Sequence, residues 1–473
     1  MAVRMSSADG RWIIAATVLG SGIAFLDGTV VNVALRAIAE DFDTNTHALQ
    51  WTIDAYLVTL TALLLLGGSV GDLFGRKRVY IGGLVAFTAA SVVCAVAPSS
   101  VWLSAARAAQ GVGGAFLVPG SLAIIAASFD EDRSRAIGAW SGLTGVASAI
   151  GPFLGGWLVD AVSWRLVFLI NVPLAAACVW VTVRHVPESR SHVTARPDWV
   201  GAALASLGLA ALCWGLIEQS LPVGLVGAAL FVAFLVVESR LPAPMLPLGL
   251  FKRRQFTGAN LTTLAVYSAL GGAFFFLVLE LQIALGYSAL EAGSALLPVT
   301  VLMLLLSSRA GALAQRIGPR IPMTVGPIVV GLGMLLFTRI EPGMSYWRAV
   351  FPGAIVFGLG LACTVAPLTA TVLAAVDADD LGIGSGVNNA VARLAGLLAV
   401  AVLPSLVAFD TDASAQAVSD AVSDAMMISA VVAVAGGVIA FLTVRTSALV
   451  DEPAAMPNVV HPCGDPCRVK LSA

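Results

Sequence analysis

Long apolar stretches recur along the chain, separated by short turns that carry most of its charged residues. A helix needs about 20 mostly apolar residues to cross the hydrocarbon core of a membrane, so this pattern predicts fourteen spans. Their predicted bounds are 12–35, 51–70, 79–98, 101–128, 136–160, 165–184, 199–217, 221–239, 256–285, 289–308, 322–340, 348–375, 383–408 and 425–445. Only 11% of the 473 residues are charged, against about 25% in soluble domains. The expected fold class is therefore an all-α membrane protein.

Lysine and arginine are distributed unevenly between the two sets of loops. If the N-terminus is cytoplasmic, twenty of these side chains fall in cytoplasmic segments and four outside, while Arg107 and Arg393 stay within spans. Cytoplasmic loops are enriched in Lys and Arg, so both termini are predicted to be cytoplasmic. High Ala, Val and Arg usage with few lysines suggests a bacterium, which places the protein in the inner (plasma) membrane.

Two predicted cytoplasmic turns resemble each other. "GSVGDLFGRKR" (68–78) joins the second and third spans, and "GALAQRIGPR" (311–320) joins the tenth and eleventh. Matching turns predict a transporter built from repeated halves. The predicted parts, in chain order, are an N-terminal six-helix half (12–184), two inserted helices (199–239), a C-terminal six-helix half (256–445) and a cytoplasmic tail (446–473). The linker 241–256 mixes prolines, apolar residues and three cations, so it is expected on the inner membrane surface.

Asp27 is the only ionisable side chain between Trp12 and Leu35. A carboxylate in hydrocarbon costs about 3 kcal/mol even on lenient scales. At 1.5 Å per residue, Asp27 lies about 12 Å from the outer end of its span and Arg107 about 9 Å from the outer end of its own. Burial favours the neutral carboxyl and a nearby arginine favours the carboxylate, so this pair is a candidate for proton binding and release. The alternatives are a fixed structural ion pair and an Arg107 side chain that reaches the outer surface.

The turn after the second span is a candidate conformational latch. Gly68 and Gly75 permit close approach of helix ends, and Asp72 is placed to pair with Arg76 or with a helix N-terminus. Lys77 adds a second cation. The alternative is a plain cytoplasmic turn whose charges set only the topology.

The fifth span contains several residues that either lack a side chain or restrict the backbone. They are Gly145, Gly151, Pro152, Gly155 and Gly156. Glycines allow close helix packing, and the proline removes a hydrogen bond and bends the helix. The alternative is a kinked packing interface with no further role.

Four other carboxylates lie in or near spans. Glu280, near the outer end of the ninth span, is a second candidate for proton coupling. Asp54, at the outer start of the second span, is a further candidate, and the alternative for it is a simple interfacial position. Glu218 and Glu238, at the ends of the inserted helices, are expected to be solvated. If Glu280 faced a cavity, it would favour cationic substrates.

Several classes of protein are excluded by missing motifs. No lysine lies in a Walker loop and the histidines form no H-E-x-x-H, which argues against an ATP-driven pump and an intramembrane hydrolase. The net charge of −2 argues against a nucleic-acid partner, and no cofactor is expected. In the tail, Cys463 and Cys467 lie beside His461, which is compatible with a soft-metal site; the alternative is a disordered tail without a metal.

These motifs together resemble the fourteen-helix drug:proton antiporters of the major facilitator superfamily over about residues 12–445. The segments that carry the resemblance are "LDGTVVNVAL", "GDLFGRKR", "RAAQGVGGAFLVPGS", "GPFLGG", "WRLVFLINVP" and "GYSALEAGSALLP". The resemblance implies two six-helix halves plus two inserted helices, an exporting "GPxxGG" element, and proton coupling by Asp27 and Arg107. It also implies that the first, fourth, ninth and twelfth spans line the central cavity. Two departures are Leu73, where the family often has a basic residue, and Gln315, where the second turn lacks the aspartate.

The expected function is export of amphipathic small molecules in exchange for protons, by a monomer whose partners are substrate, protons and the lipid bilayer. The alternatives within transport are a symporter or uniporter for a metabolite and a lipid exporter. A non-transporting membrane sensor belongs to another class, and the sequence lacks a polar region of the length of an effector domain.

Overall fold

The structure is a computed structural model that describes residues 3–129, 132–190, 197–242, 244–377 and 381–446. All regular elements in these residues are helices. In chain order they are α1 (Ala8–Phe42), α2 (Thr46–Phe74), α3 (Arg76–Ala95), α4 (Ser100–Gly114), α5 (Leu117–Ser128), α6 (Arg133–Ala161), α7 (Leu166–Leu169), α8 (Asn171–His185), α9 (Trp199–Ile217), α10 (Leu221–Glu238), η1 (Leu248–Lys252), α11 (Arg254–Ile283), α12 (Ala289–Ala295), α13 (Leu297–Ile317), α14 (Arg320–Phe337), α15 (Tyr346–Ala349), α16 (Phe351–Ala374), α17 (Leu381–Leu406) and α18 (Ala415–Thr443). They supply 14 segments long and apolar enough to cross a membrane, which confirms the predicted number and the all-helical class.

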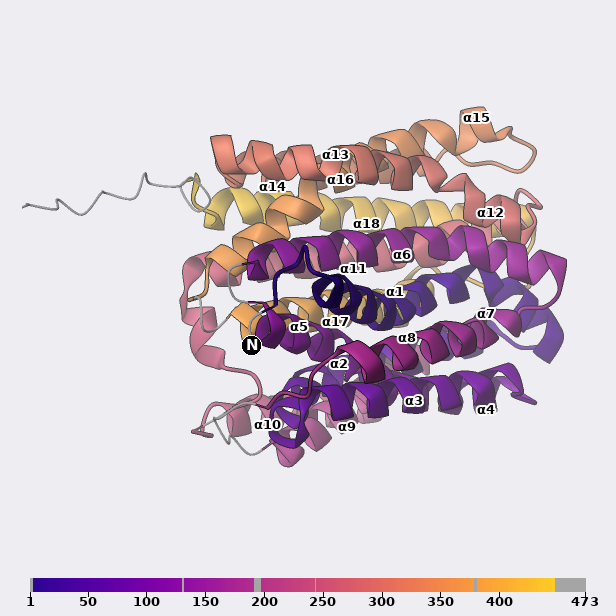
Figure 1. The fold of residues 1–473 in the computed structure, drawn as a ribbon. Coiled ribbons are helices and arrows are strands. Elements are labelled where there is room, and N and C mark those ends of the chain that lie inside the picture. Colours follow the sequence, from indigo (N-terminus) through magenta and orange to yellow (C-terminus); the bar gives the residue numbers. More distant parts are fainter. Residues whose placement is uncertain (1–2, 130–131, 191–196, 243, 378–380, 447–473) are drawn as a thin grey trace, which may run out of the picture.

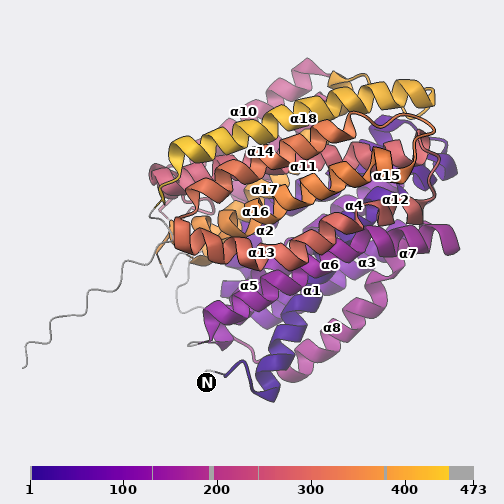
Figure 2. The same ribbon diagram turned by 90° about the horizontal axis from the view of Figure 1, so that it is seen from above.

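The helices lie side by side along one main direction, with short connections at both ends (Figure 1). We call α1–α8 the first group and α11–α18 the second group. In Figure 2, α14, α16 and α18 lie toward one side of the bundle and α1, α6 and α8 toward the other. The N-terminus and the end of α18 lie at the same end of the bundle, whereas α7, α12 and α15 gather at the other, which we call the outer end, following the predicted orientation (Figure 1).

Several helices extend beyond the predicted spans. The first helix is Ala8–Phe42 and not 12–35, and the last begins at Ala415 and not at 425. Side-chain caps set these starts, because the Ser7 hydroxyl accepts from Gly10 N and the Ser414 hydroxyl accepts from Ala417 N. Apolarity marks only the part of a helix that lies in hydrocarbon, so it underestimates helix length.

Short joints interrupt four of the predicted spans. A proline lies in the first turn of the helix after each joint, where its missing N–H breaks the run of backbone hydrogen bonds without harming the new helix. The joints are at Ala115–Phe116, Ile170, Leu296 and Val350, and the prolines are Pro119, Pro173, Pro298 and Pro352.

Glycines set equivalent close contacts in the two groups. A Cβ at Gly113 of α4 would lie 2.4 Å from Phe87 N of α3, and a Cβ at Gly360 of α16 would lie 2.5 Å from Val330 N of α14. No side chain fits at such distances, so these helix pairs pack backbone to backbone. The two groups therefore share a packing device as well as a turn sequence.

The two helices that the sequence predicts as an insertion, α9 and α10, pack against each other, and α9 packs against α2. Glu218 is exposed and interacts with Trp51 and His47 of α2, as expected of a helix end. The solvated position expected for Glu238 is wrong, because its side chain is 2% exposed and accepts from Leu246 N. That bond ties the linker to the end of α10.

The linker continues through η1 to the start of α11. Leu250 is buried against the second group. The Arg253 guanidinium donates to the Asp377 carboxylate at 2.5 Å and, through this bond and its charge, lowers the pKa of that carboxyl. The linker is thus fixed at both of its ends.

Candidate functional site

Asp27 and Arg107 form a direct ion pair in the interior of the first group. The two side chains are 0% and 1% exposed, and Arg107 Nη1 donates to Asp27 Oδ2. Asp27 lies on α1 and Arg107 on α4, and the small residues around them allow the helices to approach closely. The structure therefore brings together the two residues that the sequence placed at a similar depth, and Arg107 does not reach the outer surface.

Further polar side chains complete this cluster, and sequence reasoning did not identify them. Gln110 Nε2 donates to Asp27 Oδ1 at 2.8 Å, and Asn171 Nδ2 donates to the same oxygen at 3.0 Å. Both amides also donate to Ser91 Oγ. The sequence did contain signs of both residues. Gln110 lies three residues after Arg107 on the same helix face, and Asn171 is a lone polar residue in the apolar run that begins α8.

The contacts of Asp27 suit a charged carboxylate. Its two oxygens receive a guanidinium N–H and two amide N–H groups, which are all donors. A protonated carboxyl would have to direct its own O–H at one of these donors. Proton binding therefore requires at least one of the three contacts to rearrange.

The other contacts of Arg107 fix its position. Nε donates to Thr52 O at 3.0 Å, and Nη1 donates to Gln110 Oε1 at 2.7 Å. The guanidinium lies over the ring of Tyr56, with its carbon 4.3 Å from the centroid. Arg107 thus joins α4 to α1 and α2.

The candidate latch contains the expected ion pair. Arg76 Nε and Nη2 each lie 2.7 Å from Asp72 Oδ1. Gly75 ends α2 at φ +110°, which favours glycine, and α3 begins at the next residue. A Cβ at Gly68 would lie 3.8 Å from Pro119 Cβ, and Lys77 Nζ donates to Val183 O. All of these contacts lie within the first group.

The N-terminus of α3 is occupied by Glu188, which sequence reasoning missed. The Glu188 carboxylate accepts from Lys77 N at 3.1 Å and from Arg78 N at 3.2 Å. Asp72 therefore pairs with Arg76 and leaves this helix end to a residue that follows α8. Gly318 in the second turn also has positive φ, +85°, and a Cβ there would lie 2.0 Å from Thr446 O.

The glycine-rich element of α6 packs against both groups. Cβ atoms at Gly151 and Gly155 would lie 2.1 Å from Thr29 Oγ1 and 2.5 Å from Val30 Cγ2, both on α1. A Cβ at Gly156 would lie 2.4 Å from Ala289 O of α12. Gly145, in contrast, is exposed, and a Cβ there would meet no atom within 4 Å.

Pro152 and Asp160 extend the contact between α6 and the second group. A Cβ at Gly293 of α12 would lie 2.1 Å from Pro152 O. The Asp160 carboxylate accepts from Ala289 N at 3.1 Å and from Leu290 N at 2.8 Å. The proline and glycines of α6 thus allow the two groups to meet at the outer end.

Two glutamines add hydrogen bonds between the groups. Gln50 Nε2 of α2 donates to Val400 O of α17 at 2.7 Å, and Gln282 Nε2 of α11 donates to Val33 O of α1 at 3.0 Å. Thr411 N, which follows α17, donates to Thr46 Oγ1 at the start of α2. The contact between the groups at the outer end therefore includes α1, α2, α11 and α17 as well as α6 and α12.

Asp54 and Glu280 are buried apart from the Asp27 cluster. The interfacial alternative for Asp54 is wrong, because its side chain is 0% exposed and neither oxygen has a hydrogen-bond partner among the described residues. It lies close enough to Cys213 of α9 to interact with that thiol electrostatically. Glu280 is 1% exposed and lies beside Ser419 of α18, within the second group. Both carboxylates are therefore buried because neighbouring helices cover them.

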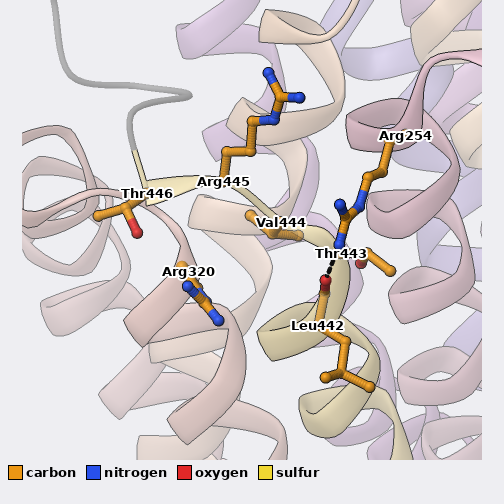
Figure 3. A pocket seen from close by; sticks show the side chains of 7 residues that line it. All are labelled: Arg254, Arg320, Leu442, Thr443, Val444, Arg445 and Thr446. Atoms are coloured by element: carbon orange, nitrogen blue, oxygen red, sulfur yellow. Dashed lines mark hydrogen bonds between the residues drawn. The ribbon is translucent and has the colours of Figure 1, made fainter.

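A cavity of about 430 Å³ opens at the end of α18 opposite the outer end. It is lined by Arg254, Arg320, Leu442, Thr443, Val444, Arg445 and Thr446 (Figure 3). Arg254 Nη2 donates to Leu442 O, and Arg320 Nε donates to Phe441 O. Both guanidinium groups thus cap the carbonyl end of a helix. The tail residues His461, Cys463 and Cys467 lie outside the described residues.

Comparison with known proteins assigns the chain to a family. The family model of the Major Facilitator Superfamily matches residues 17–400. The chain belongs to this superfamily. It is 35% identical over 418 residues to a probable actinorhodin transporter of Streptomyces coelicolor, in a match that covers 84% of this chain and 72% of the relative. It is 34% identical to a methylenomycin A resistance protein of Bacillus subtilis, with 84% and 87% covered, and 32% identical to a cephamycin export protein of Amycolatopsis lactamdurans, with 93% and 92% covered.

Solved structures show the same superfamily fold. A bacterial homologue of the human lysosomal transporter Spinster, in an inward-facing and unoccupied conformation, matches with a TM-score of 0.67 at 17% identity, over 93% of this chain and 98% of that one. A peptide transporter in complex with sulfate matches with a TM-score of 0.68 at 14% identity, over 93% and 96%. As a member of this superfamily the chain is a multi-pass membrane transporter and not an enzyme.

Proposed function

We propose that this superfamily member exports amphipathic small molecules from the cytoplasm in exchange for protons, and that Asp27 carries the proton. The observation that carries the proposal is the buried Asp27 carboxylate, held by donors from Arg107, Gln110 and Asn171. Buried charges inside spans mark ion and proton pathways. The relatives named for drug resistance or export support the direction and the substrate class.

The donor arrangement gives a physical basis for coupling. A proton that arrives from outside neutralises Asp27 and removes the Coulomb attraction that holds Arg107. The guanidinium is then free to move with α4, and the contacts it makes to Thr52 and Gln110 change with it. Release of the proton inside restores the ion pair and prepares the transporter for cytoplasmic substrate.

The contacts at the outer end fit one stage of this cycle. The donor contacts of Asp27 occur together with a closed junction of α6 and α12, where Asp160 accepts from two N–H groups of α12. We propose that this is the state that faces the cytoplasm. Conversion to the outward-facing state breaks the Asp160 contacts and separates Gly156 from Ala289.

We also propose the organisation that follows from the turn sequences. The first half is 12–184, α9 and α10 form an insertion at 199–239, and the second half is 256–445, with both termini in the cytoplasm of a bacterial cell, at its plasma membrane. Cysteines introduced near Arg253 and near Ser414, in a background without native cysteines, should react with an impermeant thiol reagent from opposite sides. Labelling of both from outside would exclude the fourteen-span topology.

The decisive experiment compares Asp27→Asn with Glu40→Gln, a variant on the same helix whose carboxylate is exposed. Cells that express each variant are tested against a panel of antibiotics and amphipathic dyes. In everted vesicles with an acidic interior, an exported compound should draw protons out, which dequenches acridine orange. Asp27→Asn should abolish both resistance and proton release, while Glu40→Gln retains them.

Other outcomes would redirect or refute the proposal. If Asp27→Asn keeps full resistance and proton release, Asp27 is structural, and Asp54 or Glu280 becomes the carrier to test. Arg107→Lys keeps the charge and loses the planar fork, so it should impair transport less than Arg107→Ala does. Uptake instead of extrusion by the unaltered protein would favour a symporter or a uniporter, and no transport at all would favour a sensor.

A further inference from the structure

Arg393 is a second cation in the interior, and the described part of the protein supplies it with no acceptor. Its Nε and Nη2 atoms are buried, and neither has a hydrogen-bond partner among the described residues. Arg107 is fully buried, and its guanidinium donates hydrogen bonds to Asp27, Gln110 and Thr52. Arg393 as a whole residue is only partly buried, and it differs from Arg107 in that its two buried nitrogens have no acceptor among the described residues.

Arg393 lies near mid-membrane, between the two groups of helices. It is 12 residues from the start of α17 and 13 from its end, so about 18–20 Å of helix separate it from either end. Its guanidinium carbon is 5.3 Å from the ring centroid of Phe25, on α1 of the first group. Tyr56 of α2 and Tyr267 of α11 are close enough to interact with it electrostatically. Substrate sites of repeat-built transporters lie at this depth and at this kind of interface.

One turn from Phe25, the partner of Arg393 on α1, the helix backbone is exposed. Gly28 lies one turn after Phe25 on α1, and it is exposed although it lies in the middle of a helix, with no atom within 4 Å of an added Cβ. Phe25 and Tyr267 are partly exposed, unlike most apolar side chains of their helices. A cation and two aromatic rings thus meet at one place, and exposed backbone of α1 lies one turn from the Phe25 ring.

The Phe25 ring compensates for only part of the cost of burying this cation. A cation–π contact is weaker than the hydration that a buried guanidinium loses. Paired acceptors, which carboxylates and phosphates present in the geometry of the guanidinium fork, would compensate for the rest.

We propose that Arg393, with Phe25 and Tyr267, binds the anionic group of the exported molecule, so that the transporter takes amphipathic anions with an aromatic or apolar body. This inference rests on the proposed export function and names its substrate class. It replaces the preference for cations that Glu280 would have given, because Glu280 lies beside Ser419 of α18 and not at this surface. Tyr56, which contacts Arg107 and interacts with Arg393, links the subsite to the Asp27 pair.

The test measures binding to the purified protein in detergent and does not depend on transport. The probes are 1-pyrenebutyrate and its methyl ester, which share an aromatic body and differ in charge. Binding is followed as the rise in melting temperature with probe concentration. The unaltered protein should respond to the acid at concentrations about tenfold lower than Arg393→Gln requires, as expected for a charge-assisted bond, while the ester should affect both equally.

Two further variants sharpen the comparison. Arg393→Lys should lie between the unaltered protein and Arg393→Gln, because it keeps the charge and loses the fork. Arg348→Gln, which alters an exposed arginine at the outer end, should respond to the acid like the unaltered protein. An equal response of the unaltered protein to acid and ester, no response to the acid, or an acid preference that survives Arg393→Gln would each overturn the proposal.

The melting temperature without probe gives an independent check. Arg393→Gln removes a partly buried charge whose Nε and Nη2 have no acceptor in the described part of the chain, so its melting temperature should equal or exceed that of the unaltered protein. A fall as large as that of Arg107→Gln would show that Arg393 has a structural partner and would overturn the proposal. If the binding results hold and the unaltered protein shows neither drug export nor proton exchange, the export function fails while the anion subsite stands.

Discussion

Replacing Asp27 with asparagine removes the charge of a buried ion pair and keeps the shape of the side chain. Arg107 would retain its bonds to Gln110 and Thr52, but its positive charge, 1% exposed, would have no counter-charge beside it. The new amide would also direct its own N–H group toward one of the donors that now hold Asp27. Breaking a buried pair by removing one partner costs about 3–5 kcal/mol, and we expect Asp27→Asn to lose that much free energy of unfolding.

The matched control is Glu40→Gln, which removes a carboxylate from the same helix. Glu40 pairs with Arg36 at 2.9 Å, and their side chains are 66% and 40% exposed. Exposed pairs contribute about 0–1 kcal/mol, so this variant should be nearly as stable as the unaltered protein. In the double variant Asp27→Asn/Arg107→Gln no uncompensated charge remains, and its loss should be smaller than the sum of the single losses by about 2–3 kcal/mol.

Titration of the purified protein with sodium dodecyl sulfate in mixed micelles, followed by the loss of helical circular dichroism, gives these free energies. The expected order of stability is Glu40→Gln, then either single change at the pair, and then the double variant, whose loss stays below the sum of the two single losses. The reasoning fails if Asp27→Asn is within about 1 kcal/mol of Glu40→Gln, the range of an exposed pair. It also fails if the two single losses add without coupling.

Three further changes test other parts of the structure. Gly156→Val adds a branched side chain where a Cβ would already lie 2.4 Å from Ala289 O, so efflux should fall while membrane insertion persists. Gly145→Val is the control: a Cβ there meets no atom within 4 Å, so both efflux and membrane insertion should be unchanged. Asp72→Asn weakens the candidate latch and should slow vesicle transport without changing probe binding; an unchanged rate would reduce the turn to a topological signal. Glu188→Gln removes a charge from the N-terminus of α3 and should cost about 1 kcal/mol in the detergent titration, and the absence of any loss would contradict that capping role.

The sequence by itself determined the number of spans and the level of the main ion pair. Apolar runs of membrane-spanning length leave few alternatives to helices in lipid, and the 14 spans follow from them. Depth along a helix depends only on residue count, so Asp27 and Arg107 could be placed at a similar level without knowledge of packing. The family motifs likewise marked the α6 glycines, whose close contacts the structure then located.

Only the tertiary structure decided which faces of those helices meet. Gln110 and Asn171 are far apart in the sequence and reach one carboxylate oxygen only because α4 and α8 both pack against α1. Asp54 and Glu238, which position along the chain placed at the surface, are buried because neighbouring helices and the linker cover them. Arg393 was visible in the sequence as a charge within a span, but its lack of an acceptor among the described residues is a property of the packed bundle. The length and periodicity of an apolar run show which part of a helix contacts lipid. The hydrogen-bond partners of its polar side chains depend on distances between helices, which no local sequence pattern encodes.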